Sequence, residues 1–295
     1  MMEDNNSIKA LVRLIEDPDE GIYNHIRDEL ISQGSKVIPI LESSWENEDY
    51  GLLFQTRIEN LIREIQLEEF RRDLNNWIQS SEKDLLQGAI IVSRYQYPNL
   101  DEQAIHEKIQ EIRKDIWLEL GDNRTPYEQV RIFNKIFYGS YGFSGNAKDF
   151  HSPLNSCMNT VLEMRKGNPL SLSIIYSVIA QSIDMPVYGV NLPNHFVLAY
   201  LDANGINSII DQENPHGTLF YINAYSKGGI FDNGEIKAFL KGLNIAESRD
   251  YFEPCSNSAI ISRMLTNLII SFQQAGNSEK VKELTQLRDL FNFNV

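Results

Sequence analysis

The sequence predicts a mostly helical α+β protein in which one buried helix packs on a small antiparallel sheet. Three observations predict this class: helical periodicity over the first two thirds of the chain, a nearly all-apolar helix after it, and several short β-type runs beyond. A length of 295 residues allows about two domains or one large domain. We expect an N-terminal helical region over 1–69, a core with leading helices over 70–250, and a C-terminal helical hairpin over 251–295.

The N-terminal region carries apolar residues at helical spacing in successive segments. These residues are Ile8, Leu11, Leu14, Ile15, Ile22, Ile26, Leu30 and Ile31, followed by Leu52, Ile58, Leu61, Ile62 and Ile65. Short polar turns such as 17–19 join the segments, which favours stacked helical hairpins, a HEAT-like helical repeat. An ordinary helical bundle fits the same pattern, because no fixed period is visible.

The helical pattern continues from 70 to 137 and is interrupted by a loop at 97–101. Asp101 is expected to cap the helix that runs to Leu120, because a short acidic side chain accepts from the free N–H groups at a helix start. Residues 138–149 are rich in Gly, Ser, Asn and Tyr and predict an irregular connection. Such a loop either carries function or simply joins two packed elements.

A helix is expected over 155–165, and a second, buried helix starts at Asn168 and Pro169. Asparagine at the N-cap and proline at the first helical position are a strong start signal, because proline has helical φ and no N–H to leave unpaired. Residues 170–183 are apolar on nearly all sides, so the helix is expected in the core. At 14 residues it is shorter than the about 20 that a bilayer requires, so no membrane span is expected.

Short strands and then two more helices are expected after residue 186. The strands are predicted at 187–190, 196–201, 208–210 and 218–221, separated by Asn, Gly and Pro turn residues. Two amphipathic helices follow at 260–274 and 278–291, around a turn at 275–277. This pair resembles half of a tetratricopeptide repeat (TPR), and such a TPR-like hairpin either caps the core or binds a peptide.

Composition narrows the classes of partner and compartment. The net charge of −14 disfavours nucleic acid and anionic membrane surfaces as partners. Residues 1–6 lack the basic and apolar segments of a secretory signal. The two cysteines, Cys157 and Cys255, lack the spacing of a disulfide framework or a zinc site, so a reduced, cytoplasmic location is expected.

Among the residues that could do chemistry, His195 has the most distinctive setting. It opens a predicted strand whose alternation places it on one face with Val197 and Ala199. Asp211 ends a later strand, and adjacent strands about 5 Å apart could bring its carboxylate to the imidazole. Such a pair is either structural or catalytic. With His216 it could also bind a metal ion, but we expect neither a metal nor a cofactor.

Three stretches of the chain resemble the bacterial SirB-type transglutaminase-like family, which has a papain-like core. They are Arg165-Lys166-Gly167-Asn168-Pro169-Leu170-Ser171-Leu172 within 155–172, the run Tyr188-Gly189-Val190-Asn191-Leu192-Pro193-Asn194-His195-Phe196 within 186–200, and Ile210-Asp211. The helices around 89–120 and the segment 263–268 also look like that family. The resemblance covers residues 70–290, and the Gly-Val-Asn-Leu-Pro-x-His-Phe run is its most specific part.

The resemblance implies that His195 and Asp211 occupy the base and orienter positions of a Cys–His–Asp triad. In catalytic transglutaminases a cysteine begins the buried helix, where the helix N-terminus and the imidazolium stabilise its thiolate. Here that position falls at Pro169 or very near it, and proline carries no nucleophile. Ser171 lies about 200° further round the helix and is expected to point elsewhere. Cys157 is expected to be a buried apolar residue.

These observations favour a non-catalytic, transglutaminase-like pseudoenzyme that serves as a cytoplasmic binding or scaffold module for a protein or peptide partner. Besides His195 and Asp211, the predicted groove is lined by Asn168, Pro169, Asn191 and Asn194. The alternative is an enzyme, an amide or ester hydrolase or acyltransferase in which His195 acts as general base on Ser171 or on bound water. A third interpretation is a helical-repeat adaptor whose partner contacts 1–70 and 258–292 and ignores the groove.

Overall fold

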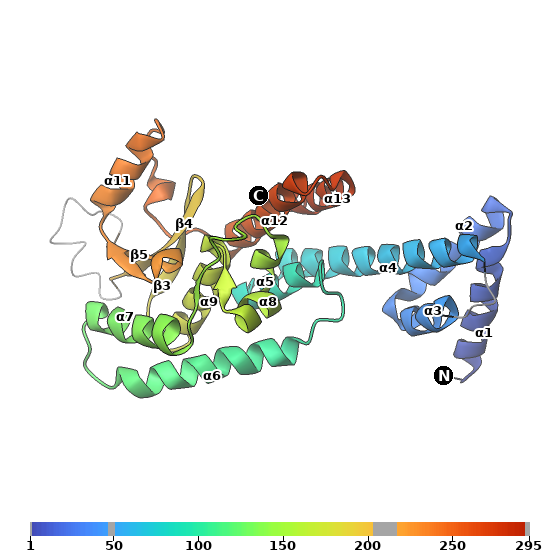
Figure 1. The fold of residues 1–295 in the computed structure, drawn as a ribbon, viewed down its shortest axis with the longest axis horizontal. Coiled ribbons are helices and arrows are strands. Elements are labelled where there is room, and N and C mark those ends of the chain that lie inside the picture. The colour runs from blue at the N-terminus through green and yellow to red at the C-terminus, as the bar shows by residue number, and fades with distance from the viewer. Residues whose placement is uncertain (1, 47–50, 203–216, 293–295) are drawn as a thin grey trace. The chain divides into compact units, whose positions relative to one another are not determined.

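A computed structural model describes residues 2–46, 51–202 and 217–292 of the chain (Figure 1). It divides into two compact units, unit 1 (Met1–Asn76) and unit 2 (Trp77–Val295). Helices predominate, and one small antiparallel sheet lies in unit 2, so the predicted α+β class is confirmed. None of the helices in the described ranges is both long and apolar enough to cross a membrane.

Unit 1 is a helical unit with its own apolar core. Its helices are α1 (Met2–Arg13), α2 (Glu20–Gln33), α3 (Ile38–Trp45) and most of α4 (Leu52–Gln79). The predicted periodic residues form the core, and Ile15, Leu30 and Leu41 are fully buried in it. α4 runs without a break past the predicted domain boundary at residue 69. The HEAT-like arrangement stays a prediction.

Arg57 of α4 holds the polar turn between α1 and α2. Its Nη1 donates to the carbonyl oxygens of Ile15 at 2.8 Å and Asp17 at 2.7 Å, and its Nη2 forms an ion pair with Glu20 at 2.7 Å. The guanidinium also lies 4.1 Å from the ring centroid of Tyr23. Because these partners occupy the cation, a buried arginine is tolerated here and the turn is fixed to α4.

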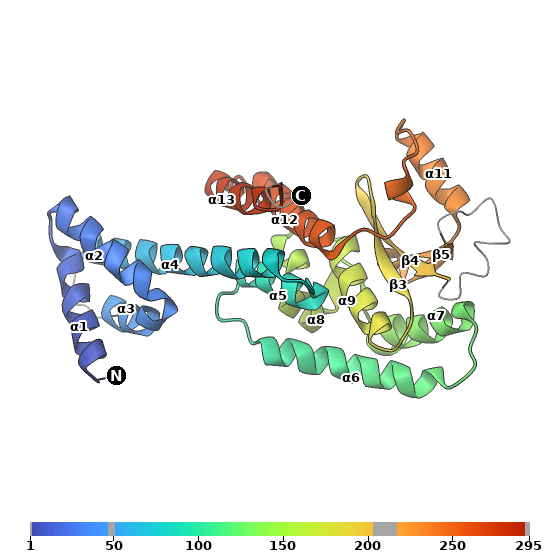
Figure 2. The ribbon, with the colours of Figure 1, turned by 180° about the vertical axis from the view of Figure 1, so that it is seen from behind.

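Unit 2 is built around one central helix, α9 (Pro169–Gln181), which the sequence predicted as buried. It packs on the sheet and contacts helices on its other sides (Figure 1 and Figure 2). The other helices of the unit are α5 (Leu85–Arg94), α6 (Glu102–Leu120), α7 (Pro126–Asn134), α8 (Met158–Met164), α11 (Asn233–Gly242), α12 (Asn257–Gln274) and α13 (Ser278–Asp289). The sequence analysis did not predict α11. The TPR-like character of α12 and α13 stays a prediction.

The sheet has the order β3-β4-β5-β6, and all neighbouring strands are antiparallel. Its strands are β3 (Val187–Leu192), β4 (His195–Leu201), β5 (Thr218–Asn223) and β6 (Gly229–Phe231). Leu192 pairs with His195, so only Pro193 and Asn194 form the turn between β3 and β4. Asn194 has φ of 57°, a conformation that asparagine tolerates. The predicted strand 208–210 lies outside the described residues.

Two local predictions before α9 were right only in part. The predicted helix 155–165 is a 3-10 helix, Pro153–Ser156, followed by α8, with Cys157 between them as the N-cap of α8. The predicted irregular connection 138–149 begins in a π-helix, Lys135–Ser140, and contains β1 (Ser144–Gly145). β1 pairs in parallel with β2 (Lys166–Gly167). Such a short pairing between segments distant in sequence leaves no periodic signal.

Candidate functional site

His195 lies at the start of β4, where its ring meets the side chain of Asn223 on β5. The ring Nε2 and the amide Nδ2 of Asn223 are 3.2 Å apart. The amide orientation is fixed, because Oδ1 of Asn223 accepts from the backbone N–H groups of Tyr225 and Ser226, both at 3.1 Å. Nδ2 can only donate, so Nε2 of His195 accepts and the ring proton lies on Nδ1.

The environment of His195 favours the neutral imidazole. Burial, and then the positive charge of Arg263, lower the pKa of His195 below its ordinary value of 6.5. Burial also lowers the pKa of Arg263, whose Nη1 donates to Oδ1 of Asn191 at 3.1 Å. Above pH 6.5 the ring of His195 is therefore mainly neutral, with an occupied Nε2 lone pair and one N–H donor.

A cavity of about 260 Å³, here called the groove cavity, opens beside His195. Four segments form it: residues 150–151, the start of α9, the turn and first residues of β4, and one face of α12. Its lining consists of Phe150, His151, Asn168, Pro169, Leu170, Asn194, His195, Phe196, Arg263, Asn267, Ile270 and Ser271. The structure thus brings the predicted residues Asn168, Pro169, Asn194 and His195 together around one cavity.

The side chain of Asn168 lines the groove cavity, but both of its polar atoms already form hydrogen bonds within the protein. Its Oδ1 accepts from the N–H of Ser171 at 2.8 Å, and its Nδ2 donates to Oγ of Ser156 at 3.0 Å. The predicted N-cap of α9 is therefore confirmed, and it includes a reciprocal contact from Ser171. Asn194, by contrast, is exposed at the turn.

Ser171 and Asn191 do not line the groove cavity. Ser171 is only 1% exposed, and its Oγ accepts from the N–H of Asn168 at 3.0 Å and donates to the carbonyl oxygen of Asn168 at 3.3 Å. Its hydroxyl packs so closely on Gly167 that a Cβ at Gly167 would lie 2.5 Å from it. These contacts give Ser171 a capping role, in agreement with the expectation that it points elsewhere. Asn191 acts indirectly, by holding Arg263.

Asp211 and His216 lie outside the described residues, so the predicted His195–Asp211 pair stays a prediction. Within the described ranges, no group of three His, Cys, Asp or Glu side chains could hold a metal ion. The residue that does meet His195, Asn223, was missed by the sequence analysis. Asn223 ends β5, which runs two residues beyond the predicted strand 218–221, and its amide carries a weaker sequence signal than the carboxylate of Asp211.

Arg263 was also missed as a site residue. Together with Asn267 and Ser271 it recurs every fourth position along α12, which places the three on one face of the helix. All three line the groove cavity, as does Ile270. The regular spacing of these three polar residues was visible in the sequence, but the cavity that they line exists only in the tertiary structure.

Neither cysteine lies in the groove cavity. Cys157 is fully buried, its Sγ lies 3.7 Å from the carbonyl oxygen of Pro153, and burial raises its pKa to about 12. Burial also raises the pKa of Cys255 to about 11. Both thiols are therefore almost fully protonated at neutral pH and unsuited to nucleophilic attack.

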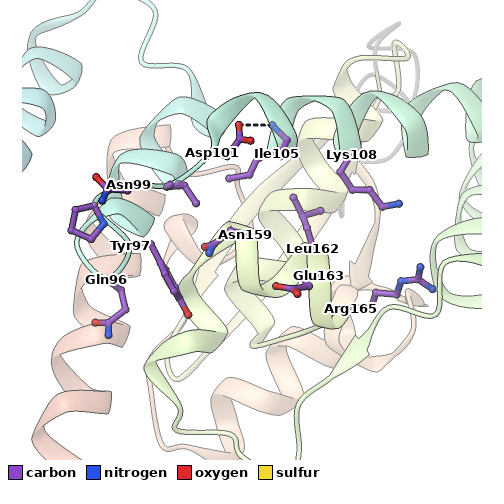
Figure 3. A pocket seen from close by; sticks show the side chains of 13 residues that line it. Gln96, Tyr97, Asn99, Asp101, Ile105, Lys108, Asn159, Leu162, Glu163 and Arg165 are labelled. Atoms are coloured by element: carbon purple, nitrogen blue, oxygen red, sulfur yellow. Dashed lines mark hydrogen bonds between the residues drawn. The ribbon is translucent and has the colours of Figure 1, made fainter. Parts of the chain in front are cut away.

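Two other cavities of unit 2 can be compared with the groove cavity by their lining residues. One of about 450 Å³ lies on the α11 side of the sheet and also reaches Asn194 and His195. A larger cavity of about 750 Å³ lies between the 97–101 loop, α6 and α8 (Figure 3). It contains no predicted site residue, and its two cations, Lys108 and Arg165, are matched by two carboxylates, those of Asp101 and Glu163. The groove cavity is therefore the candidate site because it gathers four of the predicted site residues, whereas the 450 Å³ cavity reaches two of them and the 750 Å³ cavity none.

Comparison with known proteins gives a family for this architecture. The family model described as the transglutaminase-like superfamily matches residues 103–266, more than half of the chain. A UPF0162 protein of Xylella fastidiosa is 30% identical over 190 residues, which cover 62% of this chain and 63% of the relative. A UPF0162 protein of Vibrio cholerae is 26% identical over 188 residues, covering 63% and 65% respectively.

A eukaryotic protein is similar as well. Human F-box only protein 21 is 29% identical over 160 residues, which cover 54% of this chain and 24% of that protein. The chain thus matches less than two thirds of the length of each of these three relatives. No solved structure matches it.

Proposed function

Because this chain belongs to the transglutaminase-like superfamily, we propose that it is a non-catalytic binding module whose groove cavity holds a peptide or small polar ligand. The observation that most supports this proposal is the hydrogen bonding of the His195 ring. In a working triad the orienting residue accepts from one ring N–H and leaves the other nitrogen free to take a proton. Here Asn223 donates to Nε2, so the only lone pair of the neutral ring is occupied.

The missing nucleophile supports the same proposal. Pro169 lines the groove cavity with His195, at the helix start where catalytic transglutaminases carry their cysteine. The hydroxyl of Ser171, two residues further along α9, forms hydrogen bonds with the backbone of Asn168 and is therefore not available as a replacement nucleophile. We infer a SirB-type pseudoenzyme that acts in the cytoplasm, in which α12 and α13 form a TPR-like hairpin and α12 lines the groove cavity. The F-box proteins among its relatives favour a protein or peptide partner.

A hydrolase or acyltransferase that uses water is the second candidate. The lowered pKa of His195 favours it, because a neutral imidazole is the form that can act as general base. It would require the Asn223 amide to release Nε2, so that this nitrogen can take a proton, and Asp211 could then orient the ring from the other nitrogen. We therefore place binding first.

A peptide array tests the proposed function. Random-sequence short peptides would be probed with the full chain as wild type, Ile270→Trp and Leu118→Trp. Ile270 is 43% exposed and lines the groove cavity, so tryptophan there should fill part of the space. Leu118 is 62% exposed on α6 and lines none of the three cavities, so its variant controls for an added surface tryptophan.

We expect Leu118→Trp to keep the wild-type binding pattern and Ile270→Trp to lose it by about tenfold or more, because a filled pocket excludes its ligand. Both variants would first be compared with wild type by thermal unfolding. If wild type and Ile270→Trp bind the same peptides equally well, the groove cavity is not the binding site.

A further inference from the structure

The groove cavity has a positive lining in an acidic protein. Arg263 is its one formal cation, and no carboxylate belongs to its described lining. The chain as a whole carries a net charge of −14, and the larger cavity beside the 97–101 loop has two carboxylates of its own. This local charge favours an anionic group over a neutral or cationic one.

Arg263 has hydrogen-bonding capacity that the described chain does not use. Its guanidinium has five N–H donors, and among the described residues one of these donates to Oδ1 of Asn191 at 3.1 Å. No carboxylate within the described ranges lies at ion-pair distance from it, in contrast to Arg57, which pairs with Glu20. A partly buried cation without a counter-ion is costly, and a bound oxyanion would offset that cost with charge-assisted hydrogen bonds.

Two further groups at the cavity suit an anion. The N-terminus of α9, a helix of 13 residues, reaches the cavity through Asn168, Pro169 and Leu170, and helix N-termini carry partial positive charge. His195 retains Nδ1–H as a donor, because its Nε2 accepts from Asn223. Asn191 anchors Arg263 to β3, so the guanidinium is held before any ligand arrives.

We propose that the groove cavity takes its ligand through an anionic oxygen group, a carboxylate or a phosphate, with Arg263 as the principal contact. The proposal rests on the proposed function, since it names the chemistry of the ligand for the same site. A volume of about 260 Å³ suits one such group with a short attached chain, such as the terminal residue of a peptide or a small organic acid.

Nuclear magnetic resonance on the full chain tests the proposal with three small probes. Acetate represents a carboxylate, inorganic phosphate represents a phosphate, and acetamide is the neutral analogue of acetate. The signals followed are the Nε–H of Arg263 and the ring of His195, at constant ionic strength set with chloride. The variants are Arg263→Gln, which removes the cation, and Arg165→Gln, which removes a cation from the larger cavity.

Acetate or phosphate should shift both signals saturably in wild type, and acetamide should not. The anion-induced shift of His195 should persist in Arg165→Gln. In Arg263→Gln the affinity should fall roughly 10- to 100-fold, the usual loss for a charged hydrogen bond. A response to only one of the two anions identifies the source of the oxyanion.

Two results would overturn the proposal, and they differ in what they say about the binding module. If acetamide shifts the signals as strongly as acetate does, the cavity binds ligands without regard to charge, and the proposed function survives. If neither anion shifts either signal, the anionic assignment fails whatever peptides bind. The peptide array then decides the proposed function by itself.

Discussion

Replacing Pro169 with cysteine introduces a thiol where the superfamily's catalytic cysteine is expected, beside His195 and Arg263. The two native thiols, Cys157 and Cys255, should react very slowly with an alkylating reagent, so the new thiol can be measured against them. With pKa values of about 12 for Cys157 and about 11 for Cys255, their thiolate fractions at pH 7 are about 10⁻⁵ and about 10⁻⁴. An ordinary cysteine of pKa about 8.5 is about 3% thiolate. The new thiol should therefore react roughly 300-fold faster than Cys255 and roughly 3,000-fold faster than Cys157.

Pro126→Cys is the matched control for this substitution. Pro126 also occupies the first turn of a helix with a reciprocal N-cap, formed by Thr125 and Glu128 at the start of α7, and it is partly buried like Pro169. Both new thiols experience a helix N-terminus, but only the one at 169 shares a cavity with Arg263. A thiol pKa lowered by about one unit through that cation would raise the thiolate fraction at pH 7 roughly eightfold.

Alkylation by iodoacetamide, followed site by site with mass spectrometry over a range of pH, measures these differences. We expect the rate order Pro169→Cys, then Pro126→Cys, then Cys255 and Cys157. Equal rates for the two engineered thiols would refute the idea that residue 169 stands at an activated nucleophile position. Rapid alkylation of either native cysteine in the folded wild type would refute the argument that burial raises their pKa and makes them unreactive.

Three further predictions concern Ser171 and the state of His195. Ser171→Ala should lower the free energy of unfolding, measured with urea, by about 1–3 kcal/mol, because the buried backbone N–H of Asn168 loses its acceptor. Peptide binding should persist in this variant. Lost binding at unchanged stability would contradict the capping role. Burial and Arg263 lower the pKa of folded His195, so below its ordinary value of 6.5 the unfolded chain takes up a proton that the folded chain does not, and stability falls with acid. His195→Gln should therefore make the loss of stability below that pH less steep, and an unchanged acid slope would show that the shift is absent. Nitrogen-15 spectra should show His195 with its proton on Nδ1 in wild type and a loss of that preference in Asn223→Ala; loss of the preference in Asp211→Asn alone would return the orienting role to Asp211.

The parts of the fold that were predicted are those with strong local signals. The Asn168-Pro169 start of α9 and the Asp101 cap of α6 are local chemistry, and both are observed. The strand opened by His195 was recognisable from its apolar run between turn residues. The two-strand pairing of β1 with β2 was not, because it depends on contacts between segments about twenty residues apart.

The site shows the same division. Asn168, Pro169, Asn194 and His195 follow from motifs within two short stretches, and the structure gathers them at one cavity. Arg263 comes from a helix some seventy residues later, and its proximity to His195 exists only in the packed structure. Asn223 was hidden for another reason. An amide beside a histidine attracts less notice than a carboxylate, yet its direction of hydrogen bonding determines what the ring can do.

The central claim is that the groove cavity binds its ligand without transforming it. The most direct measurement is to incubate the full chain with a peptide that it binds on the array and to recover the peptide for mass spectrometry. We predict that the peptide returns unchanged in mass, and that binding falls in Arg263→Gln. Cleavage or acyl transfer by wild type that disappears in His195→Ala would contradict the claim and establish an enzyme in its place.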